Sequence, residues 1–144
     1  METQTMAKVV VPARIEHLAD LYEAQKGKLS ADKVRAIEVP DAVVDTGATL
    51  LSLPSRLIAQ LGLRRQRTRV ARTAAGPVAF EVYEAVRLTV QGRDCVTEVT
   101  ELLDECPVLI GQVPLEVLDF LVDPKGQKLV GNPEHGGQQM IDLL

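Results

Sequence analysis

The stretch Val43-Val44-Asp45-Thr46-Gly47-Ala48 decides the fold assignment, because a short apolar strand runs straight into a turn that begins with an acid. The position of Asp45 at the strand end places its carboxylate at the edge of the expected core. Thr46 can hold the loop with its hydroxyl group, and Gly47 lets the backbone bend sharply and approach another chain closely. This turn is the leading candidate for a catalytic site.

A second turn of the same kind lies further along the chain. The apolar run Val108-Leu109-Ile110 ends in Gly111, and a short helix with an early proline, Pro114, is expected after it. The first turn is likewise followed by a proline-led helical pattern, Pro54 to Gly62. Because strand, glycine turn and helix occur twice, we expect a domain of two related halves. Only the first half carries an acid at its turn.

Most of the remaining chain alternates between apolar and polar residues, as strands do. Two long alternating stretches, 64–70 and 78–90, predict a hairpin with Ala74, Ala75 and Gly76 at its tip. Shorter strands are expected at 8–15, 34–39, 42–44, 95–103 and 127–130, the second of them ended by Pro40.

These patterns predict one mainly β domain over residues 1–144. Its core covers about 34–120. A helical excursion at about 16–33 precedes the core, where apolar residues recur at helical spacing. A turn-rich tail at about 121–144, with many glycines and prolines, follows it.

Composition and charge exclude several classes of protein. The chain has 46% hydrophobic and 3% aromatic residues, which predicts an aliphatic core, and its net charge of -4 argues against a nucleic-acid-coating protein. No apolar stretch approaches the roughly 18 residues that cross a bilayer, and residues 1–11 lack the apolar region of a signal peptide. We therefore expect no membrane partner and a cytoplasmic location, with Cys95 and Cys106 reduced.

No metal site, cofactor or nucleophilic site is expected. The sequence lacks a zinc-protease His-Glu-x-x-His, a Cys-x-x-Cys and a phosphate-binding glycine loop. His17 and His135 lie in segments that look peripheral, so we expect them to be solvent-exposed rather than metal ligands. Cys95 and Cys106 are expected to be buried small hydrophobic residues.

The acidic turn suits hydrolysis of a peptide bond without metal or covalent intermediate. Such a reaction needs one carboxylate to take a proton from water and a second carboxyl group to protonate the carbonyl oxygen. The chain holds a single Asp-Thr-Gly, at Asp45. The second aspartate must then come from another copy, which predicts a homodimer acting on a peptide or protein.

These features resemble the retropepsin-like aspartic peptidases, and the bacterial members of this retroviral type more closely than the viral ones, over about 34–120. The resemblance implies a closed β-barrel or sandwich with one or two short helices and a flap hairpin, in a homodimer. It implies that Asp45 is the catalytic acid, Thr46 hydrogen-bonds across the dimer axis, Gly47 approaches the substrate backbone and Ala48 lines the cleft.

The same resemblance assigns the second turn and the hairpin. Leu109, Ile110 and Gly111 would pack behind the catalytic loop, and the flap tip at 74–76 would close over a bound peptide and exclude water. Thr49 and Gln112 stand where many viral members carry an acid and an arginine. The loss of both partners leaves no unpaired charge but removes one clamp on the dimer.

Two other readings stay open. The chain could be an inactive module of the same fold that only dimerises or binds peptides. Alternatively, arginines on one strand could bind nucleic acid, since Arg65, Arg67 and Arg69 would share one face, with Arg64 and Arg72 nearby. We expect no nucleic-acid partner, because a charged strand edge also prevents unwanted sheet pairing and the chain offers almost no aromatic side chains for base stacking.

Overall fold

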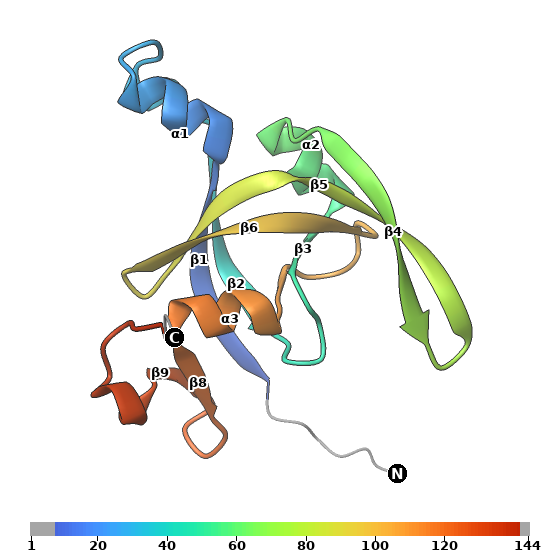
Figure 1. Ribbon diagram of the computed structural model, residues 1–144, viewed down its shortest axis with the longest axis vertical. Coiled ribbons are helices and arrows are strands. Elements are labelled where there is room, and N and C mark those ends of the chain that lie inside the picture. Colours follow the sequence, from blue (N-terminus) through green and yellow to red (C-terminus); the bar gives the residue numbers. More distant parts are fainter. Residues whose placement is uncertain (1–7, 142–144) are drawn as a thin grey trace.

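The computed structural model describes residues 8–141 and shows a β-barrel with a projecting hairpin (Figure 1). Its strands are β1 (Val9–His17), β2 (Ala36–Val44), β3 (Leu51–Pro54), β4 (Arg65–Thr73), β5 (Gly76–Val90), β6 (Arg93–Leu102), β7 (Leu109–Ile110), β8 (Phe120–Asp123) and β9 (Lys128–Gly131). Its helices are α1 (Leu18–Gln25), α2 (Ser55–Leu61) and α3 (Gln112–Leu118), with short 3-10 turns η1 (Ala31–Lys33) and η2 (Pro133–His135).

The barrel closes through its first strand. The main sheet has the order β1-β2-β7-β3-β6-β5-β4, and β1 pairs with β5 as well as with β2. Ile15 sits at this closure, opposite Ile37 of β2 and Leu88 of β5, and is fully buried. The predicted fold class, a mainly β closed barrel with a long hairpin and few short helices, is confirmed.

The core is aliphatic, as the composition predicts. Alternate residues of β1 point inward, and the strands around it contribute mostly Val, Leu and Ile. Leu61 of α2 and Leu118 of α3 are fully buried, so each short helix contributes an anchor to the core. Each of these helices ends in a residue with left-handed backbone, Gly62 and Asp119 respectively, which lets the chain turn back to the barrel.

The expectation that Pro40 ends its strand is wrong. β2 continues through Pro40 to Val44, and the register of its pairing with β1 shifts between Val11 and Ala13. At this shift Pro12 of β1 lies opposite two residues of β2, so the strands form a bulge. A bulge leaves backbone groups out of the ladder, and it therefore accommodates prolines that have no N–H to donate.

The tail forms a small sheet of its own beneath α3. β8 pairs with β9, a strand that overlaps the predicted 127–130, while β8 was not predicted. Arg93 links this sheet to the barrel, because its guanidinium donates hydrogen bonds to the carbonyls of Leu118 and Asp119 and lies 4.5 Å from the ring centre of Phe120. None of the helices within residues 8–141 is long and apolar enough to span a membrane.

Candidate active site

Asp45 directly follows β2, where it is held by β7, the short strand that precedes the second glycine turn. β7 lies between β2 and β3, parallel to the first and antiparallel to the second. Ile110 pairs with Val44, and its carbonyl accepts a hydrogen bond of 2.9 Å from the backbone N–H of Asp45. The backbone of the aspartate is thus an extension of the sheet.

The turn after Asp45 is stabilised by its own carboxylate. The N–H of Gly47 donates to Oδ1 of Asp45 at 2.9 Å, and the N–H of Ala48 donates to the Asp45 carbonyl at 3.0 Å. Thr46 and Gly47 are exposed, while Asp45 and Ala48 are half-buried. The loop therefore presents the aspartate, the threonine and the glycine to the outside of the barrel.

The start of α3 supports this loop from behind. Backbone N–H groups of Gly111, Gln112 and Val113 donate to the carbonyls of Leu50, Ala48 and Thr49, at 2.8 to 3.0 Å. A Cβ atom on Gly111 would lie only 2.4 Å from the Leu50 carbonyl oxygen, so only glycine fits there. Of the three predicted support residues, Ile110 and Gly111 hydrogen-bond the loop segment, and Leu109 pairs with Val43.

The predicted flap corresponds to the hairpin of β4 and β5. It reaches out from the barrel and ends level with the loop between β2 and β3 in Figure 1. At its turn, the Thr73 hydroxyl donates to the Gly76 carbonyl at 2.6 Å and accepts from the Ala75 N–H at 3.2 Å. Gly76 has φ 110°, a value that disfavours other residues, and Ala74 and Ala75 are exposed.

The sheet register shows which face of the hairpin is continuous with the sheet face next to Asp45. Residues paired directly across strands lie on one face of a sheet. One row of such pairs crosses the barrel on the side away from the core, and we call it the outer row: Val43, Leu109, Ser52, Thr100, Val82 and Arg67. Asp45 follows Val43 by two residues and continues on the same side.

Side-chain contacts agree with this row. The hydroxyls of Ser52 and Thr100 lie 2.6 Å apart, and Arg67 forms an ion pair with Glu98, two residues before Thr100 on β6. Val82, between Arg67 and Thr100 in the row, is fully buried but does not belong to the main core cluster. Asp45 and the flap face that carries Arg67 therefore belong to one continuous surface.

Residues 37–117 match the family model described as gag-polyprotein putative aspartyl protease, which covers more than half of the chain. The chain belongs to this family. It is a retropepsin-like aspartic protease by descent, as the sequence resemblance predicts. Among solved structures, the solution structure of the simian foamy virus (mac) protease shares 22% identity with a TM-score of 0.48, over 76% of this chain and 93% of that chain. No curated protein matches the sequence significantly.

The expected exposure of the two histidines is wrong in this retropepsin-like protease. His17 is 4% exposed, with Nδ1 accepting from the Asp20 N–H at 3.2 Å and Nε2 lying 3.3 Å from a carboxylate oxygen of Glu84. His135 is half-buried, and its Nδ1 lies 2.6 Å from Asp119, which lowers the pKa of that carboxyl group. His17 thus connects the first turn of α1 with β5, and His135 connects η2 with the end of α3, contacts that their neighbours in sequence do not reveal.

Acids, histidines and cysteines also lie outside the Asp45 loop within residues 8–141. No group of three or more His, Cys, Asp or Glu side chains is arranged there to hold a metal ion. Cys95 is buried, and burial raises the pKa of its thiol to about 11, so it stays protonated at neutral pH. Cys106 is a free, half-buried cysteine, less buried than expected.

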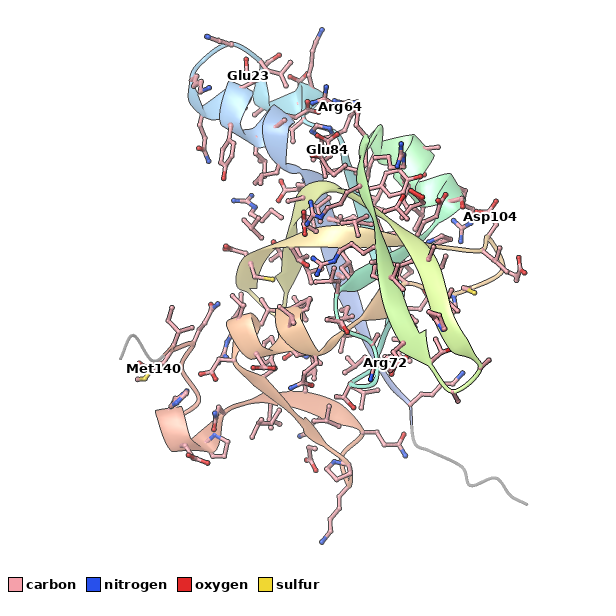
Figure 2. The ribbon with its side chains drawn as sticks, turned by 45° about the vertical axis from the view of Figure 1, so that its right-hand side comes forward. Glu23, Arg64, Arg72, Glu84, Asp104 and Met140 are labelled. Atoms are coloured by element: carbon pink, nitrogen blue, oxygen red, sulfur yellow. The ribbon has the colours of Figure 1, made fainter. Side chains whose placement is uncertain are left out.

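The arginine stripe of the alternative reading does not form in β4. The register of β4 and β5 shifts between Arg65 and Arg67, so Arg65 points to the side of Thr68 and Glu81 instead of sharing a face with Arg67. Arg64 lies 3.7 Å from Glu84 at the root of the hairpin, where Figure 2 labels both residues. Arg64, Arg65 and Arg67 each pair with a carboxylate, which leaves no row of free cations for phosphates.

A cavity of about 400 Å³ lies between α3, β8 and the tail. Gln112, Asp119, His135 and Met140 are among the residues that line it, and it contains none of the predicted site residues. Asp45 itself is half-buried, and its neighbours Thr46 and Gly47 are exposed.

Proposed function

We propose that this protein is an aspartic endopeptidase that works as a homodimer, with a water molecule activated between two Asp45 carboxylates. The observation that carries the proposal is the presentation of Asp45 on a hydrogen-bonded, outward-facing loop between β2 and β3. Membership of the aspartyl protease family supports the same chemistry.

The single chain supplies half of the catalytic pair. Within residues 8–141 the Asp45 carboxylate has one hydrogen-bond partner, the Gly47 N–H. A second aspartate is needed for a base and an acid to act on one peptide bond. A two-fold dimer with the two loops in contact would supply it, with exposed Thr46 positioned to hydrogen-bond the partner loop.

In the proposed reaction, one Asp45 carboxylate takes a proton from water while the resulting hydroxide forms a bond to the carbonyl carbon. The carboxyl group of the second Asp45 gives its proton to the carbonyl oxygen, producing a neutral gem-diol. The C–N bond then breaks as the gem-diol returns a proton from one oxygen to a carboxylate and the nitrogen receives a proton from the pair. Each turnover consumes one water and needs no cofactor.

Substrate binding would use the open backbone around the loop and the flap. An extended peptide can add to exposed strands through main-chain hydrogen bonds, and side-chain pockets then give selectivity. Gly47 lets the peptide backbone approach, Ala48 lines the floor, and the tip residues Ala74, Ala75 and Gly76 close over the peptide and exclude water.

The test is hydrolysis of a mixed peptide library between acidic and neutral pH over a range of protein concentrations. We expect cleavage that rises faster than linearly with concentration, because the active species is a dimer. Asp45→Asn should reduce the rate at least about a thousand-fold while circular dichroism shows an unchanged fold. Asp41→Asn, the same change at an exposed aspartate on the same strand, should keep full activity.

Full activity of a folded Asp45→Asn protein would overturn the mechanism. A well-folded dimer that cleaves no peptide would instead favour the alternative, an inactive dimerisation or peptide-binding module of the same fold.

A further inference from the structure

The flap strand β4 carries its two free arginines on opposite faces. From Arg67 to the turn, β4 and β5 pair without a shift, residue by residue. Side chains alternate along a regular strand, so Arg69 shares the face of Arg67, while Arg72 points to the other. Neither Arg69 nor Arg72 has a side-chain hydrogen bond or ion pair within residues 8–141.

Arg69 lies on the sheet face that continues, strand by strand, to Val43 next to the Asp45 loop. Arg67 belongs to the outer row, which ends at Val43 beside the catalytic loop. Arg69 stands two residues closer to the flap tip on this same face, opposite Phe80 of β5. A peptide held between the flap and the loop of Asp45 would therefore pass within reach of its guanidinium group.

The surroundings of Arg69 leave its charge available. Arg67 is neutralised by Glu98 and Arg65 by Glu81, and Glu81 lies on the opposite face of the hairpin. The neighbours of Arg69 on its own face toward the tip are apolar: Phe80, Ala71 and Val78, of which Val78 is 49% exposed. An unpaired cation next to exposed apolar groups suits a ligand with a carboxylate and a hydrophobic side chain.

We propose that Arg69 is a specificity-determining residue that selects peptide substrates with an acidic side chain a few residues from an apolar scissile site. The inference rests on the proposed peptidase function. Arg69 lies four positions before the turn residue Thr73, or about 13 Å at the strand rise of about 3.3 Å per residue. With the scissile bond beneath the flap turn and the peptide running along β4, that distance equals about four residues of an extended peptide, so the acid belongs three to five positions from the cleaved bond. In a two-fold dimer, Arg69 of the second copy would contact the peptide on the other side of the cleaved bond.

The chemistry favours Arg over a neutral residue for this role. A guanidinium group offers paired N–H donors that match the two oxygens of a carboxylate. The apolar neighbours reduce competition from water and strengthen the electrostatic attraction between the guanidinium and the carboxylate. Selection of Glu over Gln at one position should then reach about ten-fold, the factor typical of one charge-assisted hydrogen bond.

The experiment compares peptides that share an apolar cleavage site and differ by Glu or Gln at one position, three to five residues to either side. With wild-type protein we expect kcat/KM to be about ten-fold higher for the best Glu peptide than for its Gln twin. Arg69→Gln should bring this ratio close to one. Arg69→Glu should give a higher kcat/KM for a matched Lys peptide than for the Glu peptide. Arg72→Gln removes the same charge from the opposite face and should leave the ratio unchanged.

Binding to the Asp45→Asn protein separates this inference from the peptidase itself. Fluorescence anisotropy of the same labelled peptides should show Glu preferred over Gln, and the double variant with Arg69→Gln should lose that preference. Cleavage with equal rates for Glu and Gln peptides would overturn the role of Arg69 and leave the peptidase standing. Loss of the preference in Arg72→Gln alone would overturn the assignment of faces. Glu-selective binding without cleavage by wild-type protein would overturn the peptidase and retain the acidic subsite.

Discussion

At Gly111 a hydrogen atom in place of a methyl group allows the loop that follows Asp45 to meet the start of α3. An added Cβ would approach the Leu50 carbonyl oxygen to 2.4 Å and the carbonyl carbons of Thr49 and Ala48 to 2.7 and 2.8 Å. All three contacts are with backbone carbonyl groups whose oxygens accept hydrogen bonds from the start of α3, so these groups cannot move aside independently. The residue therefore serves packing rather than turn conformation.

Gly111→Ala should destabilise the protein by about 3 kcal/mol, because overpacking a well-packed site typically costs 1–3 kcal/mol or more. Denaturant unfolding with a common slope measures this change. Gln112→Ala is the matched control: its side chain is exposed and donates a hydrogen bond of 3.3 Å to Glu116 on the same helix, so the stability should change by less than about 0.5 kcal/mol. Equal stability of Gly111→Ala and wild type would show that the loop can shift away from α3.

Among the secondary-structure elements, α1 depends on polar contacts rather than on burial. It has no buried residue, and Tyr22 on its surface is 48% exposed. The side chain of Arg35 donates two hydrogen bonds to the two Asp20 oxygens at 2.8 and 3.0 Å, and the Arg35 backbone N–H donates a third at 3.0 Å. The hydrogen bonds from Arg35 lower the pKa of Asp20 to about 2.

This pair predicts an acid-sensitive contribution to stability. The pKa of Asp20 is lower in the folded state, about 2, than in an unfolded chain, about 3.9, so its contribution is complete above pH 4 and is lost as the pH falls toward 2. Asp20→Asn should therefore flatten the loss of unfolding free energy between pH 4 and pH 2, measured by urea titration at each pH. Asp32→Asn, at an exposed aspartate of η1, should keep the wild-type slope. Identical slopes for wild type and Asp20→Asn would refute the linkage.

At the scale of the whole molecule, closure of the barrel rests on β1. This strand joins β2 to β5, two strands that residues 45–75 separate in the chain, and it leads directly into α1. Ile15 contributes the buried side chain at the point where all three strands meet. Loss of packing there affects both seams of the barrel at once.

Ile15→Ala should lower the unfolding free energy by about 2–5 kcal/mol, the range for deleting a large aliphatic side chain from a core. Thermal and urea unfolding would both report the change. Val96→Ala removes a smaller side chain that is 54% exposed on β6, and should cost less than about 1 kcal/mol. Comparable losses from the two variants would mean that β1 is not essential for closure.

Much of this architecture follows from local patterns. Short-range sequence patterns predict the acidic turn, the second glycine turn, the hairpin and the short helices. These patterns are the alternation of apolar and polar residues and the positions of glycine and proline. The two bulges are different, since they depend on a partner strand. From the sequence alone, Pro40 is expected to end its strand and Arg65 to share a face with Arg67. The register shifts against the partner strands change both expectations.

The sequence by itself determined the fold class and the position of Asp45 at a strand end, because both depend on residues close together in the chain. Only the tertiary structure decided that His17 and His135 are covered, that Arg65 and Arg67 point to different sides, and that Arg69 shares a face with Asp45. Burial, pairing and facing depend on contacts between residues tens of positions apart. The register of paired strands and the packing of side chains decide these features, and a short stretch of sequence does not determine either of them.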